Sequence, residues 1–253
     1  MVRELSYDAH VYTSLSWGEA TPEVCVRAAE AAGLVAVALT DHYHLEDSQV
    51  APRLAAYTRA AAGSPVRVVA GAECDILDPA GRLSLAEAGR ASFPLVLARL
   101  SVRTEGVAQA VPARLEALLQ NLREALVNAC RRPGVNVLAV PFSLGQFPAA
   151  LAPEQIPRSL LEEVAGVMRE QGVAFEIGSG IWTGYPELSL EEFTEQYGRL
   201  VMAFSREGVK FLVGSEARCP GAVGSLRYAE RIIAAARLER SQFVDLTRLR
   251  AVN

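Results

Sequence analysis

The sequence lacks the features that mark several classes of protein. Its four cysteines lie far apart, so no C-x-x-C pair points to a metal or redox site. No apolar run reaches the roughly 20 residues that a membrane-spanning helix needs, and residues 1–10 contain no apolar core of a signal peptide. The net charge of −4 gives no electrostatic reason to expect nucleic acid or an anionic membrane as a partner. We therefore predict a cytoplasmic protein with reduced thiols that binds neither nucleic acid nor membranes.

Motifs for nucleotide binding and for serine catalysis are also missing. Neither G-x-G-x-x-G nor G-x-x-x-x-G-K-[ST] follows an apolar run, which argues against a dinucleotide site or a P-loop. No G-x-S-x-G turn presents a serine nucleophile. Histidine is scarce as well, since the whole chain has three: His10, His42 and His44. They lie in the stretches "YDAHVYT" and "LTDHYH", so any chemistry that needs an imidazole depends on these two segments.

Apolar runs and longer amphipathic segments alternate along the chain. The runs predict strands at 7–13, 34–42, 66–77, 94–101, 136–142, 173–180 and 209–217. The longer segments predict helices at 22–32, 48–62, 106–131, 157–171 and 224–238, and a capping box of Ser189 and Glu192 opens a further helix. Residues 78–93 form a long irregular connection, which we interpret as a β-excursion or a lid.

The order of these elements predicts the fold class. Seven β-then-α units imply a parallel sheet with right-handed crossovers. At 253 residues this favours a single α/β domain, residues 1–253, folded as a distorted (β/α)7 barrel similar to a TIM barrel. An open doubly wound sheet is the alternative.

In a β/α barrel the C-terminal ends of the strands carry the functional site. Histidines and carboxylates fall at several of the predicted strand ends. In chain order the residues there are His10, Asp41, His42, Glu73, Ser101, Val140, Glu176, Glu216 and Arg218. Imidazole and carboxylate groups are ligands for zinc, manganese or iron, so the pattern indicates a metal-type site at one end of the barrel.

Five short motifs resemble those of the polymerase and histidinol phosphatase (PHP) family. They are "DAHVYT", "LTDH", "GAE", "VPF" and "GSEA", in this order and on these predicted strands. The resemblance extends over nearly the whole chain, and T-D-H followed one strand later by G-x-E is its most telling pair. It implies a distorted seven-unit barrel that holds divalent metals with His, Asp and Glu ligands and hydrolyses phosphate esters.

The family's ligand pattern is incomplete in this sequence. Four positions keep a ligand-type side chain: His10, His42, Glu73 and Glu216. Five do not: Tyr12, Trp17, Ser101, Val140 and Arg218. The resemblance therefore implies at most one metal, zinc, manganese or iron, with His10, Glu73 and Glu216 as its ligands. A two-metal clamp on a phosphate is lost.

Other residues of the pattern are assigned to catalysis or to substrate binding. His42, positioned by Asp41, is the predicted general acid or hydrogen-bond donor. Arg218, which replaces a ligand, is predicted to hold a phosphate by bidentate hydrogen bonds, with Arg103 assisting.

Arg218, Tyr12 and Trp17 also change the lining of the site. The guanidinium of Arg218 is expected to repel a nearby cation and to neutralise Glu73 or Glu216. Tyr12 and Trp17 are predicted to line a pocket for the substrate. The alternative is that the two aromatic side chains fill a disused site.

Three functions are compatible with this pattern. The favoured one is a PHP-like barrel with a degenerate metal site, which binds a small phosphorylated or otherwise anionic ligand with weak or no hydrolytic activity. The alternative is a single-metal phosphoesterase that acts on a small phosphorylated metabolite, that is, a metal-dependent phosphoric ester hydrolase. A purely structural or interaction module is the third.

Overall fold

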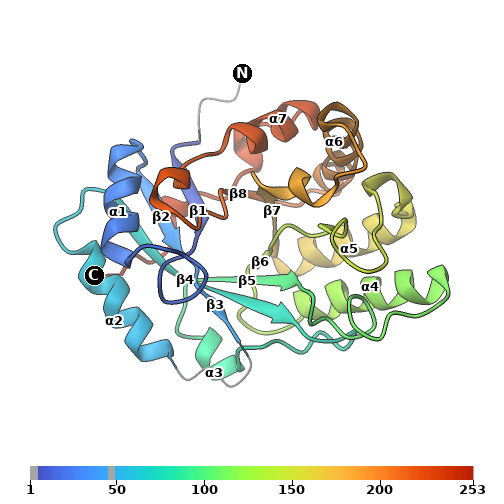
Figure 1. The fold of residues 1–253 in the computed structure, drawn as a ribbon, viewed down its shortest axis with the longest axis horizontal. Helices are drawn as coiled ribbons and strands as arrows, with labels where there is room; N and C mark the ends of the chain where they lie inside the picture. The colour runs from blue at the N-terminus through green and yellow to red at the C-terminus, as the bar shows by residue number, and fades with distance from the viewer. Residues whose placement is uncertain (1–4, 45–48, 253) are drawn as a thin grey trace.

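The strands of the computed structural model, which describes residues 5–44 and 49–252, wind into a nearly closed parallel barrel (Figure 1). Seven strands follow one another around it: β1 (Tyr7–Val11), β2 (Ala36–Leu39), β4 (Arg67–Ile76), β5 (Leu95–Leu100), β6 (Val137–Leu138), β7 (Ala174–Gly178) and β8 (Phe211–Gly214). The short β3 (His42–Tyr43) lies off this path and pairs with β4. The backbone N–H of Tyr12 donates to the Ala217 carbonyl at 3.0 Å and so joins the first strand to the last.

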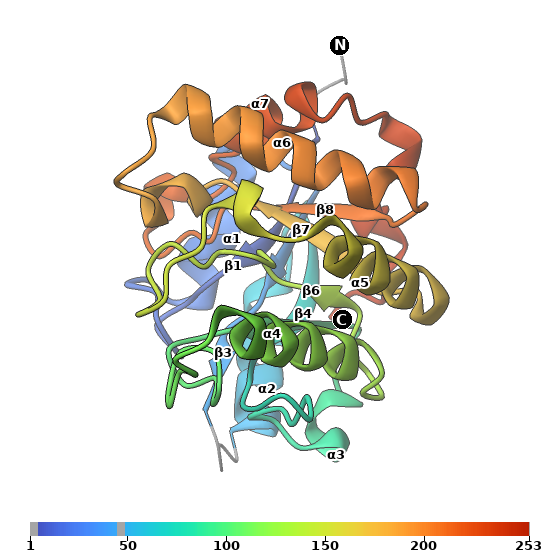
Figure 2. The same cartoon turned by 90° about the vertical axis from the view of Figure 1, so that its right-hand side faces the viewer.

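Helices connect the strands and cover the outside of the barrel (Figure 2). They are α1 (Pro22–Ala31), α2 (Val50–Ala61), α3 (Glu87–Arg90), α4 (Leu115–Cys130), α5 (Arg158–Gln171), α6 (Leu190–Arg206) and α7 (Arg227–Ala235). Each longer helix runs back from the C-terminal end of one strand toward the start of the next, so the loops that follow the strands gather at one end. We call this end, where the strands have their C-terminal residues, the barrel mouth. No helix of the described residues is long and apolar enough to cross a membrane.

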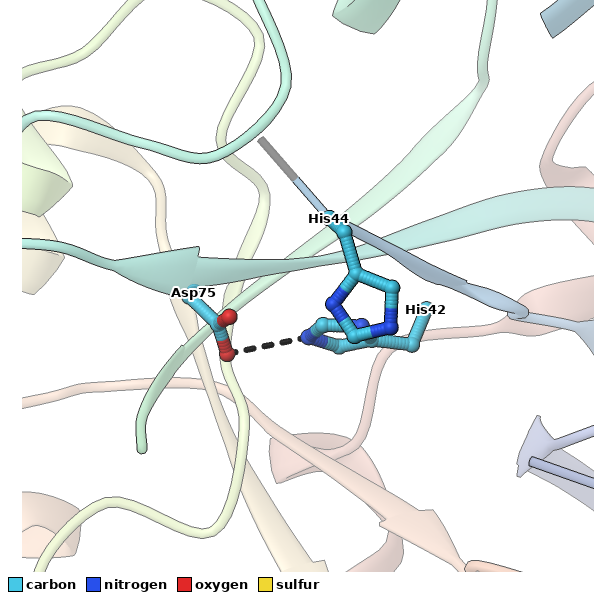
Figure 3. A group of neighbouring side chains, drawn as sticks. All are labelled: His42, His44 and Asp75. Carbon is cyan, nitrogen blue, oxygen red and sulfur yellow. Dashed lines mark hydrogen bonds and ion pairs between the residues drawn. The ribbon is translucent and has the colours of Figure 1, made fainter. Parts of the chain in front are cut away.

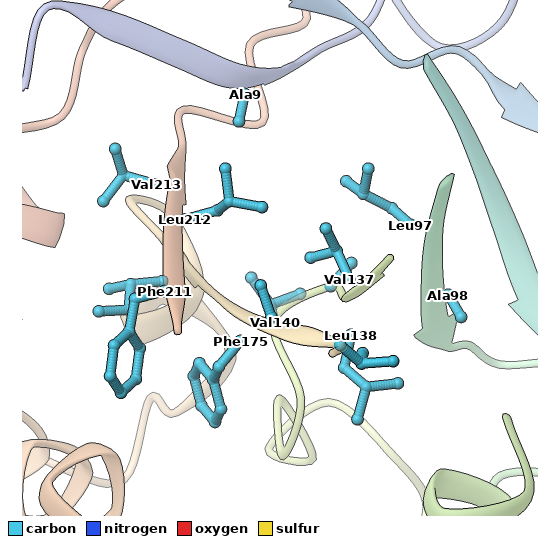
Figure 4. Close-up of a cluster of buried hydrophobic side chains, with 14 of the residues drawn as sticks. Ala9, Leu97, Ala98, Val137, Leu138, Val140, Phe175, Phe211, Leu212 and Val213 are labelled. Atoms are coloured by element: carbon cyan, nitrogen blue, oxygen red, sulfur yellow. The ribbon is translucent and has the colours of Figure 1, made fainter. Parts of the chain in front are cut away.

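The hydrophobic core is built from the strands and from the inner faces of the helices. Figure 4 shows part of it: Leu97, Val137 and Leu212 of three strands point into the barrel, and Phe175 of β7 points the other way, toward α6. All four side chains are buried. Complete burial of a Leu, Val or Phe side chain stabilises the fold by about 1.5–3 kcal/mol. The apolar strands therefore hold the barrel together, and polar residues concentrate at its mouth.

The structure confirms the predicted barrel and corrects several element boundaries. The run 34–42 is divided into β2 and β3, because Thr40 and Asp41 between them direct their side chains to other segments. The helix predicted from residue 106 begins at Leu115, which follows Pro112, a residue that disfavours helix at the position before it. Residues 78–93 contain α3 and one antiparallel bridge to Ile76, so they form a small excursion at the edge of β4.

The predicted capping box is confirmed. The Ser189 hydroxyl accepts the backbone N–H of Glu192 at 3.2 Å, and the Glu192 carboxylate accepts the backbone N–H of Ser189 at 2.9 Å. The α6 helix that it opens packs against β7, where Tyr197 and Phe204 contact the ring of Phe175.

Candidate functional site at the barrel mouth

His10, at the end of β1, lies between two buried carboxylates. Its Nδ1 atom is 2.7 Å from Glu176 Oε1, and its Nε2 atom is 3.3 Å from Glu73 Oε1. Burial disfavours the imidazolium, but the charges of Glu176 and Glu73 and their hydrogen bonds outweigh it and hold the pKa of His10 well above its usual range. The site therefore favours the protonated imidazole, which joins β1 to β4 and β7.

Arg99, on β5, supplies a second cation to the same site. Its Nη1 atom donates to Glu73 Oε1 at 2.9 Å and to the Tyr12 hydroxyl oxygen at 3.1 Å, and it lies 4.0 Å from Glu216 Oε2. Burial would raise the pKa of Glu73, but the Arg99 guanidinium and His10 outweigh it and lower the pKa to about 2. His10 and Arg99 together balance the charges of Glu73 and Glu176. The protein itself thus supplies a counter-charge to each of these two carboxylates.

Tyr12 completes this network as a neutral phenol. Its hydroxyl lies 3.0 Å from both carboxylate oxygens of Glu73, to which it donates. Burial and the neighbouring Glu73 charge raise its pKa well above the usual value. Tyr12 is therefore a donor to a carboxylate, and an anionic tyrosinate ligand is disfavoured at this position.

Two glycines leave room for the carboxylates that enter the barrel from β7 and β8. A Cβ atom on Gly178 would collide with Oε1 of Glu216, and a Cβ atom on Gly214 would collide with Oε1 of Glu176 and with His10. Glu216 itself has a φ of 55°, in the left-handed region that few residues other than glycine adopt. Burial and the neighbouring Glu176 charge raise the pKa of Glu216, so its proton is held more tightly than in an unfolded chain.

Trp17 and Arg218 lie over this network. The indole of Trp17 stacks on the imidazole of His42, with ring centroids 4.1 Å apart and planes 13° from parallel. The Arg218 guanidinium lies 5.4 Å from the Trp17 ring centroid and 5.8 Å from that of Tyr12. Arg99 lies 5.8 Å from the Trp17 centroid. Two guanidinium groups and an indole therefore meet at the opening of the mouth.

Asp41 has a structural role in the loop that carries Trp17. Its carboxylate accepts the backbone N–H of Thr13 at 2.7 Å and the hydroxyls of Thr13, Ser16 and Tyr57 at 2.6, 2.5 and 2.6 Å. Among the described residues none of its hydrogen bonds goes to His42, whose Nε2 atom lies 2.9 Å from Asp75 Oδ1. The structure therefore gives His42 a different carboxylate partner from the predicted one.

His42, His44 and Asp75 form a second polar group at the edge of the mouth (Figure 3). One donor atom from each of these residues lies within 4.8 Å of the other two. His42 and Asp75 are buried and His44 is partly exposed. This is a set of side chains with the chemistry of a metal site.

The structure brings most of the predicted site residues together. His10, Glu73, Glu216, Tyr12, Trp17, His42 and Arg218 all lie at the mouth in the network described above. Arg103 is exposed, and its backbone N–H donates to the Ser101 hydroxyl at 3.1 Å. Arg218 was predicted to neutralise Glu73 or Glu216, but the guanidinium that lies beside both carboxylates belongs to Arg99.

Sequence reasoning missed the roles of Arg99, Asp75 and His44. Arg99 is a charged residue inside an apolar strand, which is a signal in itself because a buried charge needs a partner. Asp75 lies two residues after Glu73 and so shares its face of β4. His44 has the same relation to His42. Because side chains alternate between the two faces of a strand, the positions of Glu73 and His42 could have identified Asp75 and His44.

Comparison with known proteins decides the family. The family model of the PHP domain matches residues 7–227. The chain belongs to the PHP domain family. No curated protein sequence gives a significant match.

Solved structures share the fold of this PHP domain. The histidinol phosphate phosphatase of Lactococcus lactis, complexed with zinc, L-histidinol and phosphate, superposes with a TM-score of 0.62 at 15% identity, over 91% of this chain and 93% of that one. The HisK protein of Listeria monocytogenes superposes with a TM-score of 0.62 at 11% identity, over 86% and 97%. A chain of an archaeal ribonuclease P bound to mature tRNA gives 0.53 at 13% identity, over 90% and 88%. At these identities the likeness concerns the fold alone.

The mouth of this PHP domain does not fit the metal cluster that the family resemblance implies. The Arg99 guanidinium is 2.9 Å from Glu73 and 4.0 Å from Glu216, so a divalent cation between these carboxylates would be repelled by a fixed positive charge. Val140, at another position of the ligand pattern, offers no donor atom. The assignment of His10, Glu73 and Glu216 as ligands of one metal stays a prediction, and it requires Arg99 to move.

Proposed function

We propose that this PHP domain binds a small anionic ligand, such as a phosphate monoester, at the barrel mouth and hydrolyses it weakly or not at all. The observation that carries the proposal is the contact of Arg99 with Glu73. A protein cation occupies the place where the family pattern implies metal ions. Its expected location, the cytoplasm, rests on the sequence alone.

The remaining hydrogen-bond capacity of the mouth favours an anion. The side chain of Arg99 is 19% exposed, and its Nε atom has no hydrogen-bond partner in the part of the chain that the structure describes. Arg218 is exposed beside it. Guanidinium groups hold phosphates and carboxylates through paired hydrogen bonds, and Trp17 supplies an aromatic wall. Hydrolysis by this family's chemistry would need metal ions to activate water and to stabilise the leaving group.

Calorimetric titration of inorganic phosphate and of phenyl phosphate into chelator-treated protein tests this proposal. We expect saturable binding that Arg218→Ala weakens about tenfold, the size of one lost charge-assisted contact. Arg59→Ala is the matched control, because Arg59 is an exposed arginine in the last turn of α2, at the end opposite the mouth. The proposal fails if neither ligand binds or if the two variants lose affinity equally.

The second candidate function is a single-metal phosphoesterase that acts on a small phosphorylated metabolite. The contact of His10 Nε2 with Glu73 Oε1 at 3.3 Å favours it. Among the described residues, however, the His/Asp/Glu group close enough to hold a metal is His42, His44 and Asp75. In that function His10, Glu73 and Glu216 would hold zinc, manganese or iron, which would activate a water molecule. His42 would remain the proposed acid, with Asp75 in place of Asp41 as its positioning residue. Arg218 and Arg103, with Tyr12 and Trp17, would bind the substrate.

A phosphatase assay with added manganese or zinc separates the two functions. Turnover that appears with metal and disappears in Glu73→Gln would support the phosphoesterase. Turnover that stays at background with either metal supports the binding function.

A further inference from the structure

We propose that His42, His44 and Asp75 form a binding site for one zinc-type divalent cation, separate from the His10–Glu73–Glu216 position. This site goes beyond the proposed anion binding and does not depend on it. Neither His44 nor Asp75 corresponds to a position of the family's ligand pattern. The site follows from the geometry of this chain.

The backbone places the three side chains side by side. β3 and β4 are parallel neighbours, with His42 in register with Glu73 and Tyr43 in register with Cys74. His44 lies two residues after His42, and Asp75 two residues after Glu73, so each pair projects on one side of its strand. The alternating sequence His42-Tyr43-His44 thus presents two imidazoles next to the Asp75 carboxylate (Figure 3).

The distances are close to those of a tetrahedral site. His42 Nε2 and Asp75 Oδ1 are 2.9 Å apart, and the donor set as a whole lies within 4.8 Å. With metal–nitrogen and metal–oxygen bonds of about 2.0–2.2 Å, tetrahedral ligands lie roughly 3.4 Å from one another. His44, which directly follows β3 and is partly exposed, completes the set.

The buried members of the group retain capacity for a ligand. In the part of the chain that the structure describes, His42 is the one hydrogen-bond partner of the Asp75 carboxylate. The Nδ1 atom of His42, a residue only 1% exposed, has no hydrogen-bond partner there. The site uses Nε2, the ring nitrogen that faces Asp75, so the capacity that counts is that of the Asp75 carboxylate, whose other lone pairs are open to a metal ion.

The surroundings hold His42 in place and leave Asp75 without an arginine partner among the described residues. Trp17 stacks on one face of the His42 ring and fixes its plane. Arg99, which is in register with Asp75 on β5, is engaged with Glu73. No ion pair among the described residues joins Asp75 to an arginine. Two imidazoles and one carboxylate are a ligand set for zinc and for neighbouring first-row metals, and they leave a fourth position for water or for an oxygen of another ligand.

Zinc titration into chelator-treated, dialysed full chain, followed by calorimetry, tests this site. We expect one zinc per chain. His44→Ala should weaken binding about 100-fold or more, because loss of even an outer partner of a metal ligand costs 10- to 100-fold. Glu216→Gln is the matched control, since it removes a carboxylate at the other position, and it should leave the zinc affinity unchanged. Circular dichroism of both variants checks that they fold.

A second readout uses the stacking of Trp17. The chain has two tryptophans, so Trp182→Phe leaves Trp17 as the only emitter. Cobalt should quench its fluorescence in Trp182→Phe but not in Trp182→Phe with His44→Ala.

Three outcomes would overturn the site. The first is a wild-type chain that binds no zinc, and the second is binding that survives His44→Ala. The third is binding that Glu216→Gln abolishes while His44→Ala retains it, because the metal would then lie at His10, Glu73 and Glu216. None of them bears on phosphate binding by Arg218, so this inference and the proposed function fail independently.

Discussion

At the scale of single residues, one arginine changes what the mouth can do. Arg99 brings a permanent positive charge to Glu73 and Glu216, and His10 adds a second one between Glu73 and Glu176. A buried pair of this kind adds little net stability, but removal of one partner is costly because the other charge is left buried and unpaired. The network therefore makes clear predictions for its carboxylates.

Glu73→Gln should destabilise the protein by about 3–5 kcal/mol, because Arg99 and His10 lose their shared counter-charge. The pKa of Glu73 is lowered to about 2 in the folded state. Its contribution to stability is therefore present above the unfolded value, about 4.3, and is lost as the pH falls through about 2. Urea unfolding at pH 7 and at pH 3 measures both effects. A loss below about 1 kcal/mol at pH 7 would contradict the ion-pair network.

Glu216→Gln should have the opposite effect. Burial and the charge of Glu176 raise the pKa of Glu216, so its contribution to stability is present below the unfolded pKa and is lost as the pH rises through the folded pKa. At pH 7 the neutral glutamine should raise the free energy of unfolding by roughly 0.5–1.5 kcal/mol, an ordinary size for one substitution. The gain should vanish near pH 4. Urea unfolding at pH 7 and at pH 4 measures this gain. A variant that is less stable than the wild type at pH 7 would contradict the repulsion between Glu216 and Glu176.

The sequence predicted these residues unevenly. His10, Glu73 and Glu216 were expected at one mouth because parallel β/α units bring strand ends together, and the structure places them there. The role of Arg99 was not predicted. In the predicted strand 94–101 we expected the last residue, Ser101, to face the site. Which residue of a strand faces its neighbour depends on the register between strands, and the sequence does not contain that information directly.

At the scale of elements, small departures from regular strands position the site. The break between β2 and β3 lets Asp41 bind the loop of Thr13 and Ser16, which carries Trp17. The glycines at the ends of β7 and β8 leave space for Glu216 and Glu176. Apolar periodicity predicts that these strands exist but does not predict the local breaks, since hydrogen bonds from distant segments determine them.

Gly214→Ala should destabilise the barrel by about 1–3 kcal/mol, the usual cost of an added methyl in a packed interior. The new Cβ would meet the Glu176 carboxylate and His10. Gly166→Ala is the matched control, because Gly166 lies within α5 with no atom in the way. There the same change should stabilise by up to about 1 kcal/mol through helix propensity. Thermal unfolding of both variants tests this. Equal changes in stability would show that the site does not need the absence of a side chain at Gly214.

At the scale of the whole molecule, the PHP fold is retained although much of the ligand pattern is replaced. At 15% identity the barrel still superposes with a zinc- and phosphate-bound relative over most of both chains. A fold therefore does not determine a function, which depends on the side chains placed on it. This barrel combines a mouth whose carboxylates pair with His10 and Arg99, the exposed guanidinium of Arg218 and the proposed cation site at β3.

An anionic ligand should stabilise the whole domain if it binds only the folded state. At a concentration 100 times its dissociation constant, phosphate should add about 2.7 kcal/mol to the free energy of unfolding. Thermal unfolding with and without phosphate, at constant ionic strength, measures this, and chloride serves as the control anion. The same shift in Arg218→Ala would show that the ligand binds elsewhere.

The most direct test of the ion-paired mouth is a zinc-edge anomalous difference map from crystals grown with excess zinc. Our account predicts no anomalous peak within bonding distance of His10, Glu73 and Glu216, with Arg99 still in contact with Glu73. Two or more peaks among these residues, with Arg99 displaced from Glu73, would contradict it.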